Sequence, residues 1–195
     1  MKVIGLLGGV GAGKSTVAGM LRELGASVFD ADAAAREALE EPGTRRAATA
    51  LLGVDAGDRA AVAGRVFGNP GTLKALEALL HPPVRRRMEA WLAAERARGA
   101  AAAVLDVPLL AEAGLDGLCD VLLFVEAPES LREARTAGAR GWAAGEAARR
   151  QALQGDLAAK RAKAHAVISN AGDLAGTRDQ TRVFWNRHIQ GGQDR

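Results

Sequence analysis

The chain has 195 residues, 48% of them hydrophobic and 25% charged, which is enough to bury a sizeable core as a globular protein. Its net charge is only +3, its basic residues are scattered and its aromatic content is 4%, which argues against a nucleic-acid-binding protein. No apolar run is as long as a membrane span, the first residues resemble a strand rather than a signal sequence, and Cys119 is the single cysteine. We therefore expect a cytoplasmic protein with no membrane or nucleic-acid partner.

The first predicted element is a short buried strand over residues 2–7, followed by the segment Gly8-Gly9-Val10-Gly11-Ala12-Gly13-Lys14-Ser15-Thr16. This segment fits the pattern G-x-x-x-x-G-K-[ST] of loops that bind nucleotide phosphates, and a helix is predicted after it. Glycine permits positive φ angles and a close approach of backbone N–H groups to an anion, at the positive end of the helix. Lys14 adds a charge for the β- and γ-phosphates, and the Ser15 hydroxyl can bind Mg²⁺. The segment predicts a nucleoside triphosphate site.

A second predicted strand over residues 26–29 ends in Asp30-Ala31-Asp32, and a helix is predicted over residues 33–39. Carboxylates at the carboxyl end of a strand lie where open α/β sheets bind their ligands. Asp30 is either a helix N-cap or part of the site. Asp32 is favoured as the carboxylate that takes the proton of the acceptor hydroxyl in phosphoryl transfer. Arg36 either holds Asp32 or a substrate phosphate, or lies on a solvated helix face.

Residues 41–99 are predicted to be helical, with breaks at glycine and proline clusters that include His81-Pro82-Pro83. Small-molecule kinases carry their acceptor-binding subdomain as a helical insertion at this place in the chain, so we expect this block to bind the acceptor. His81, at the predicted break before Pro82, is either structural or a ligand. The cluster Arg85-Arg86-Arg87 is either a solvated face or part of an anion site.

A third predicted strand over residues 101–106 ends in Asp106. This fits the second element of a phosphate site, in which an aspartate holds Mg²⁺ directly or through water. The segment Pro108-Leu109-Leu110-Ala111-Glu112 follows at the ligand edge of the predicted sheet. Glu112 is there either a contact for substrate or metal-bound water, or a surface residue.

A fourth strand over residues 120–125 leads into a helix that Pro128 opens, and five arginines follow: Arg132, Arg135, Arg140, Arg149 and Arg150. In a kinase, arginines of a helical lid neutralise the charge of the triphosphate. We expect Arg132, Arg135 and one of the 149/150 pair on a solvated face instead. A fifth strand over residues 166–170 ends in the turn Asn170-Ala171-Gly172, beside the phosphate loop, where a base can bind. A closing helix extends to Ile189.

Several of these stretches occur together in one known family: Gly5 to Ala18, Asp30-Ala31-Asp32 with Arg36, Arg65-Val66-Phe67, Leu76-Glu77 with His81-Pro82, Asp106 to Glu112, and Val167 to Gly172. In this combination the chain resembles the bacterial dephospho-CoA kinases over nearly its whole length. The resemblance implies an α/β fold, the three-layer P-loop NTPase fold with a parallel five-stranded sheet. It also implies one kinase domain over residues 1–195, with a core (1–40, 100–130 and 164–190), an inserted helical CoA-binding subdomain (about 41–99) and a helical lid (about 131–160).

The resemblance further implies the last step of coenzyme A biosynthesis, in which ATP with Mg²⁺ phosphorylates the 3′-hydroxyl of the ribose of dephospho-CoA, in a monomer or small homo-oligomer. The implied catalytic residues are Asp32, Lys14 and Arg140. The implied ATP-binding residues are Gly11, Ala12, Gly13, Lys14, Ser15, Thr16, Arg150 and Asn170. The implied substrate contacts are Asp32, Arg36, His81, Pro82, Leu109 and Glu112. The implied magnesium ligands are Ser15 and Asp106.

The chain departs from the family pattern at Leu7, His165 and Asp156, where Thr, Asp and Pro are usual. The lid is slightly short between Arg140 and Arg150, so Arg149 is an alternative to Arg150. Two other hypotheses stay open: another P-loop small-molecule kinase, such as a nucleoside monophosphate kinase, and a nucleotide-dependent regulatory switch. A guanine-specific switch would carry N-K-x-D, and no asparagine of this chain precedes a lysine.

Overall fold

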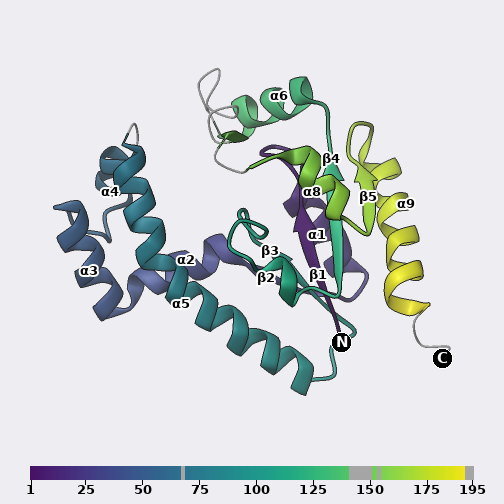
Figure 1. Cartoon of the computed structure of the whole chain (residues 1–195), viewed down its shortest axis with the longest axis horizontal. Coiled ribbons are helices and arrows are strands. Elements are labelled where there is room, and N and C mark those ends of the chain that lie inside the picture. The colour runs from purple at the N-terminus through teal and green to yellow at the C-terminus, as the bar shows by residue number, and fades with distance from the viewer. Residues whose placement is uncertain (67–68, 141–150, 153–154, 192–195) are drawn as a thin grey trace. The chain divides into compact units, whose positions relative to one another are not determined.

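The computed structural model describes residues 1–66, 69–140, 151–152 and 155–191 of the chain. It divides into two compact units, one of residues 1–29 and 95–195 and the other of residues 30–94. Figure 1 traces both units, which are described separately below.

The first unit is built on a five-stranded sheet in the order β2-β3-β1-β4-β5. Its strands are β1 (Lys2–Leu7), β2 (Ser27–Asp30, whose last residue belongs to the second unit), β3 (Ala102–Asp106), β4 (Val121–Glu126) and β5 (Ala166–Ser169). Strand β1 pairs in parallel with β3 on one side and β4 on the other, and β4 pairs in parallel with β5. The predicted parallel sheet of five strands is confirmed. Because parallel strands end at the same edge, the segments that follow β1, β3 and β4 come together there.

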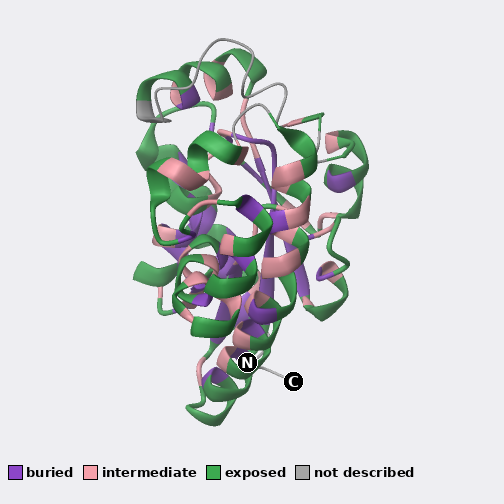
Figure 2. Cartoon of the chain, turned by 90° about the vertical axis from the view of Figure 1, so that its left-hand side faces the viewer, coloured by how far each residue is buried: buried purple, intermediate pink, exposed green. Residues whose placement is uncertain are grey.

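The helices of this unit are α1 (Lys14–Glu23), α6 (Glu129–Arg140), α8 (Leu157–Lys163) and α9 (Leu174–Trp185), with a 3₁₀ turn η1 (Asp116–Leu118) and a π-helical turn η2 (Asn186–Gln190). Helices α1 and α9 contact each other, and α8 contacts β4. One core cluster joins strand residues such as Ile4 and Leu123 to Leu21 of α1 and Phe184 of α9. Figure 2 shows the buried residues concentrated along the strands. The sheet is therefore the rigid support of the loops at its carboxyl edge.

The second unit consists of helices: α2 (Ala31–Glu40), α3 (Pro42–Leu52), α4 (Arg59–Val66) and α5 (Pro70–Ala97, whose last three residues belong to the first unit). A small core of Ala48, Leu52, Ala56 and Leu76 holds α3 and α5 together. This agrees with the helical character predicted for residues 41–99. No helix in the described ranges combines the length and the apolar character needed to cross a membrane.

The break predicted at His81-Pro82-Pro83 is wrong, because α5 continues through both prolines. Proline removes one backbone donor and its ring clashes with the carbonyl four residues earlier, so it either kinks or ends a helix. Here Leu76 before the prolines and Met88 and Leu92 after them are buried. Figure 1 shows that the axis of α5 bends along its length.

Candidate active site

The loop between β1 and α1 has the backbone that its glycines predict. Gly8, Gly11 and Gly13 have positive φ angles of 143°, 76° and 92°. A Cβ on Gly8 would collide with the Val125 carbonyl oxygen, and one on Gly13 would collide with Asn170 Nδ2. Glycine is required at these positions both by the backbone angle and by the lack of space.

The positively polarised N-terminus of α1 faces the space that the loop encloses. Gly13 is the N-cap of α1, and within the described ranges no side chain caps the helix, so its first N–H groups are available to an anion. Lys14 is the first residue of α1, and its Nζ donates to the carbonyl oxygens of Gly8 (2.8 Å) and Gly9 (3.1 Å). The ammonium group is thereby held over the loop, where phosphate oxygens can reach it.

Ser15 and Asp106 come together at the same edge. The Ser15 hydroxyl donates to Asp106 Oδ2 at 2.8 Å, because β1 and β3 are parallel neighbours and Asp106 ends β3. A hydroxyl and a carboxylate are hard oxygen ligands of the kind Mg²⁺ prefers, and Mg²⁺ needs only one or two carboxylates when phosphate and water complete its shell. The described residues hold no larger cluster of metal-binding side chains. The pair therefore fits a magnesium ion that is shared with a nucleotide.

Asn170 lies directly beside the loop, where its turn was predicted. It is 3% exposed, its Nδ2 donates to the Ala12 carbonyl oxygen (2.8 Å) and its Oδ1 accepts from Thr177 Oγ1 (3.0 Å). Arg135 Nη2 donates to its backbone carbonyl oxygen (2.9 Å). Asn170 thus supports the loop through its hydrogen bond to Ala12, a contact that the sequence alone does not specify.

Arg132 and Arg135 do not lie on a solvated helix face, so that expectation is wrong. Both are half-buried, and Arg132 Nη1 lies 3.5 Å from the Val10 carbonyl oxygen and 3.2 Å from Gln151 Oε1. Gln151 in turn accepts from the Val10 N–H at 2.9 Å. The available signal was the i, i+3 spacing of the two arginines at the start of a helix that directly follows β4.

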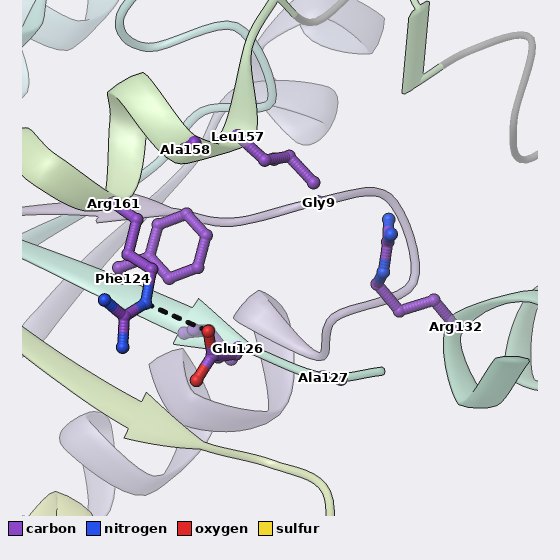
Figure 3. A pocket seen from close by; sticks show the side chains of 9 residues that line it. Gly9, Phe124, Glu126, Ala127, Arg132, Leu157, Ala158 and Arg161 are labelled. Atoms are coloured by element: carbon purple, nitrogen blue, oxygen red, sulfur yellow. Dashed lines mark hydrogen bonds and ion pairs between the residues drawn. The ribbon is translucent and has the colours of Figure 1, made fainter. Parts of the chain in front are cut away.

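A cavity of about 150 Å³ lies beside this part of the loop, and Figure 3 shows the side chains that line it. Its lining includes Gly9, Phe124 and Leu157, with Arg132 at one side. Arg161 of α8 donates from Nε to Glu126 Oε1 at 3.0 Å along its wall. The cavity therefore adjoins the phosphate loop and carries two guanidinium groups.

Glu112 is paired with a lysine that sequence reasoning did not single out. Lys160 Nζ lies 2.6 Å from Glu112 Oε1, with side-chain exposures of 8% for Lys160 and 27% for Glu112. A buried ammonium group is tolerated only with such a partner. Leu109 is half-buried in the turn that follows β3.

The other residues that are predicted to bind the phosphoryl acceptor belong to the second unit. Asp30 caps α2, since its Oδ1 accepts from the Ala33 N–H at 2.9 Å. Asp32 lies in the first turn of α2 and Arg36 one turn later, and both are exposed. His81 and Pro82 are exposed on α5.

Two of the three arginines of the 85–87 cluster form ion pairs within the same unit. Arg85 pairs with Glu89 at 2.9 Å, and Arg87 bridges Glu37 and Glu41, each at 2.7 Å. The hydrogen bond from Arg87 holds the pKa of Glu41 below its usual range. Arg87 is thus engaged in structure. Of the predicted lid arginines, Arg140 is the last residue of α6, and Arg149 and Arg150 lie outside the described residues.

Comparison with known families decides which kinase this site belongs to. The family model described as dephospho-CoA kinase matches residues 2–176. The chain belongs to the dephospho-CoA kinase family. Its activity is that of the family, a kinase reaction that completes coenzyme A biosynthesis.

Individual relatives agree with this assignment. The dephospho-CoA kinase of Deinococcus radiodurans is 44% identical, over 91% of this chain and 87% of its own. A crystal structure of TT1252 from Thermus thermophilus is 34% identical and matches with a TM-score of 0.78, over 96% of this chain and 97% of that one. The dephospho-CoA kinase from Campylobacter jejuni shares the fold, with a TM-score of 0.71 at 22% identity over 98% of both chains.

Proposed function

We propose that the loop of residues 8–16 is the donor site of this kinase, that the donor is ATP, and that the acceptor is the ribose 3′-hydroxyl of dephospho-CoA. The observation that carries the proposal is the Ser15–Asp106 hydrogen bond at the glycine-capped N-terminus of α1. This edge of the sheet therefore brings together the N–H donors of the loop, a lysine and a pair of oxygen ligands. Phosphoryl transfer needs these groups together.

In this proposal the triphosphate binds to the N–H groups of Gly11, Ala12, Gly13, Lys14, Ser15 and Thr16. Lys14 leaves its contacts with the loop carbonyls and follows the β- and γ-phosphates. Ser15 and Asp106 hold Mg²⁺, which when bound neutralises charge on the phosphate oxygens. Arg140 and Arg150 neutralise charge that develops during transfer, and Asn170 keeps the loop in shape.

The acceptor side of the proposal rests on Asp32. Its exposed carboxylate takes the proton of the 3′-hydroxyl as the oxygen attacks the γ-phosphorus, and ADP leaves in line. Arg36, His81, Pro82, Leu109 and Glu112 bind the rest of dephospho-CoA. The partly exposed Glu112 carboxylate is oriented for this contact by Lys160.

The test is an ADP-release assay with Mg²⁺ and ATP, in which dephospho-CoA is compared with a panel of nucleoside monophosphates. We expect stimulation by dephospho-CoA alone. Equal stimulation by a nucleoside monophosphate would assign the acceptor site to another substrate, and no stimulation by dephospho-CoA would overturn the proposal. The division into core, helical insert and lid, the monomeric or small oligomeric state and the cytoplasmic location stay predictions.

A further inference from the structure

Two N–H donors from different parts of the first unit meet at one side-chain oxygen above the phosphate loop. Gln151 Oε1 accepts from the Val10 backbone N–H at 2.9 Å and from Arg132 Nη1 at 3.2 Å. The Val10 N–H belongs to the glycine-rich loop, and Arg132 lies on the first turn of α6. Figure 3 shows Arg132 beside the stretch of loop that carries Gly9.

A backbone N–H of an anion-binding loop and a guanidinium group are both donors suited to an anionic oxygen. Here they share a neutral carboxamide oxygen instead. Gly9 leaves the space for this arrangement, since a Cβ there would lie 2.5 Å from Arg132 Nη1 and 2.8 Å from Gln151 Oε1. The carboxamide oxygen of Gln151 thus lies at a position where the same two donors would bind a phosphate oxygen more strongly.

The position of Lys14 indicates which phosphate this is. In loops of this kind the lysine reaches the β- and γ-phosphates. Lys14 Nζ lies on the carbonyl oxygens of Gly8 and Gly9, immediately before Val10 in the chain. The Val10 N–H and Arg132 therefore flank the terminal-phosphate end of the loop.

Gln151 is poorly satisfied in this position. Its Nε2 is buried and has no hydrogen-bond partner in the part of the chain that the structure describes. A buried donor that lacks a partner weakens the contact as a whole. A ligand that offers a charged oxygen to the Val10 N–H and Arg132 can therefore displace the carboxamide.

We propose that Arg132 and the Val10 N–H form a binding subsite for the terminal phosphate of ATP, and that Gln151 Oε1 occupies this subsite in the nucleotide-free chain. The inference rests on the proposed function, because it requires ATP at the loop. It adds a phosphate-binding arginine outside the predicted set and an internal competitor of the nucleotide. A purely structural role for Gln151, as a clamp on the loop, predicts the opposite sign for its removal.

The test is equilibrium binding of ATP and of ADP, each with Mg²⁺, to the full-length chain and its variants. Gln151→Ala should bind ATP about three- to tenfold more tightly, because the binding-competent state no longer competes with the internal contact. Gln151→Glu should bind ATP more weakly than the unchanged chain, because a carboxylate holds Arg132 and the Val10 N–H more strongly. Gln190→Ala, an exposed glutamine of η2, is the matched control and should change neither affinity.

Arg132→Gln should weaken ATP binding by about tenfold or more and ADP binding by less than about twofold, because only ATP carries the terminal phosphate. Arg132→Lys, which keeps the charge but not the planar fork, should fall between. Thermal unfolding of each variant reports whether it is folded. If Gln151→Ala weakens ATP binding or leaves it unchanged, or if Arg132→Gln affects ATP and ADP equally, this inference is overturned while the proposed function stands. If the unchanged chain binds no ATP, the proposed function itself fails.

Discussion

Lys160 Nζ and Glu112 Oε1 lie 2.6 Å apart, and the lysine side chain is 8% exposed. Glu112→Gln removes the partner of a buried charge and should lower the free energy of unfolding by about 2–3 kcal/mol, less than for a fully buried pair because Glu112 itself is partly exposed. Urea unfolding followed by circular dichroism measures the change.

Two variants serve as controls for this pair. Asp179→Asn removes an exposed ion pair with Arg182 and should change the free energy of unfolding by less than about 0.5 kcal/mol. Lys160→Met combined with Glu112→Gln should recover part of the loss, because no unpaired charge remains. A double variant as unstable as the sum of its single changes would contradict the pairing.

Asp32→Asn should reduce kcat by about 10²- to 10⁴-fold, the usual contribution of a general base, and leave ATP affinity within about twofold. Steady-state kinetics and ATP binding measure the two effects separately. Asp30→Asn is the control, because asparagine caps a helix as well as aspartate does. Turnover near that of the unchanged chain in Asp32→Asn would remove Asp32 from the role of base.

Ser15→Ala removes the hydroxyl that donates to Asp106 and should raise the Mg²⁺ concentration for half-maximal activity by about tenfold or more. Ser15→Thr keeps the hydroxyl and should stay close to the unchanged chain, since the loop pattern accepts either residue. Titration of activity with Mg²⁺ checks both. An unchanged requirement in Ser15→Ala would exclude the hydroxyl as a ligand.

Gly13→Ala should destabilise the chain by about 1–3 kcal/mol, because φ is 92° and the added Cβ collides with Asn170 Nδ2. Gly19 lies in α1, and a Cβ added there would have no described atom within 4 Å, so Gly19→Ala should be neutral or stabilising by up to about 1 kcal/mol. Denaturant unfolding of the two variants gives the comparison. Equal stabilities would show that the loop can relax at residue 13.

Burial raises the pKa of the Cys119 thiol to about 12. At pH 8 the folded chain should therefore react with a thiol reagent at least about a hundredfold more slowly than the unfolded chain, because the thiolate is the nucleophile. With a reagent that releases a coloured thiolate when it reacts with cysteine, the absorbance of that product, recorded with and without urea, measures the two rates. Similar rates would place Cys119 at the surface.

The strands and the phosphate loop could be predicted because their signals are local. Each strand is a short, mostly apolar run, and four of the five adjoin a glycine or an aspartate, so their limits agree with the structure to within one or two residues. The loop is specified by glycines that no other residue can replace at those φ angles. The limits of the strands and the backbone of the loop are both determined by residues that are neighbours in the sequence.

The contacts that shape the site are not local. Lys160 is 48 positions from Glu112, and Gln151 is 141 positions from Val10, so no spacing in the sequence connects them. The sequence alone predicts a solvated position for Arg132, because arginine side chains are mostly exposed. The continuation of α5 through Pro82 depends on packing around it, which overrides the local preference of proline.

Asn170 also sets the order in which the site can be completed during synthesis. The Ala12 carbonyl oxygen that it binds lies 158 positions earlier, and Thr177 of α9, which holds Asn170, is later still. A ribosome-bound chain that ends before β5 carries the whole nucleotide-binding motif but lacks the side chain that supports it. The first functional segment to be synthesised therefore reaches its final form only when the last strand and helix have been added.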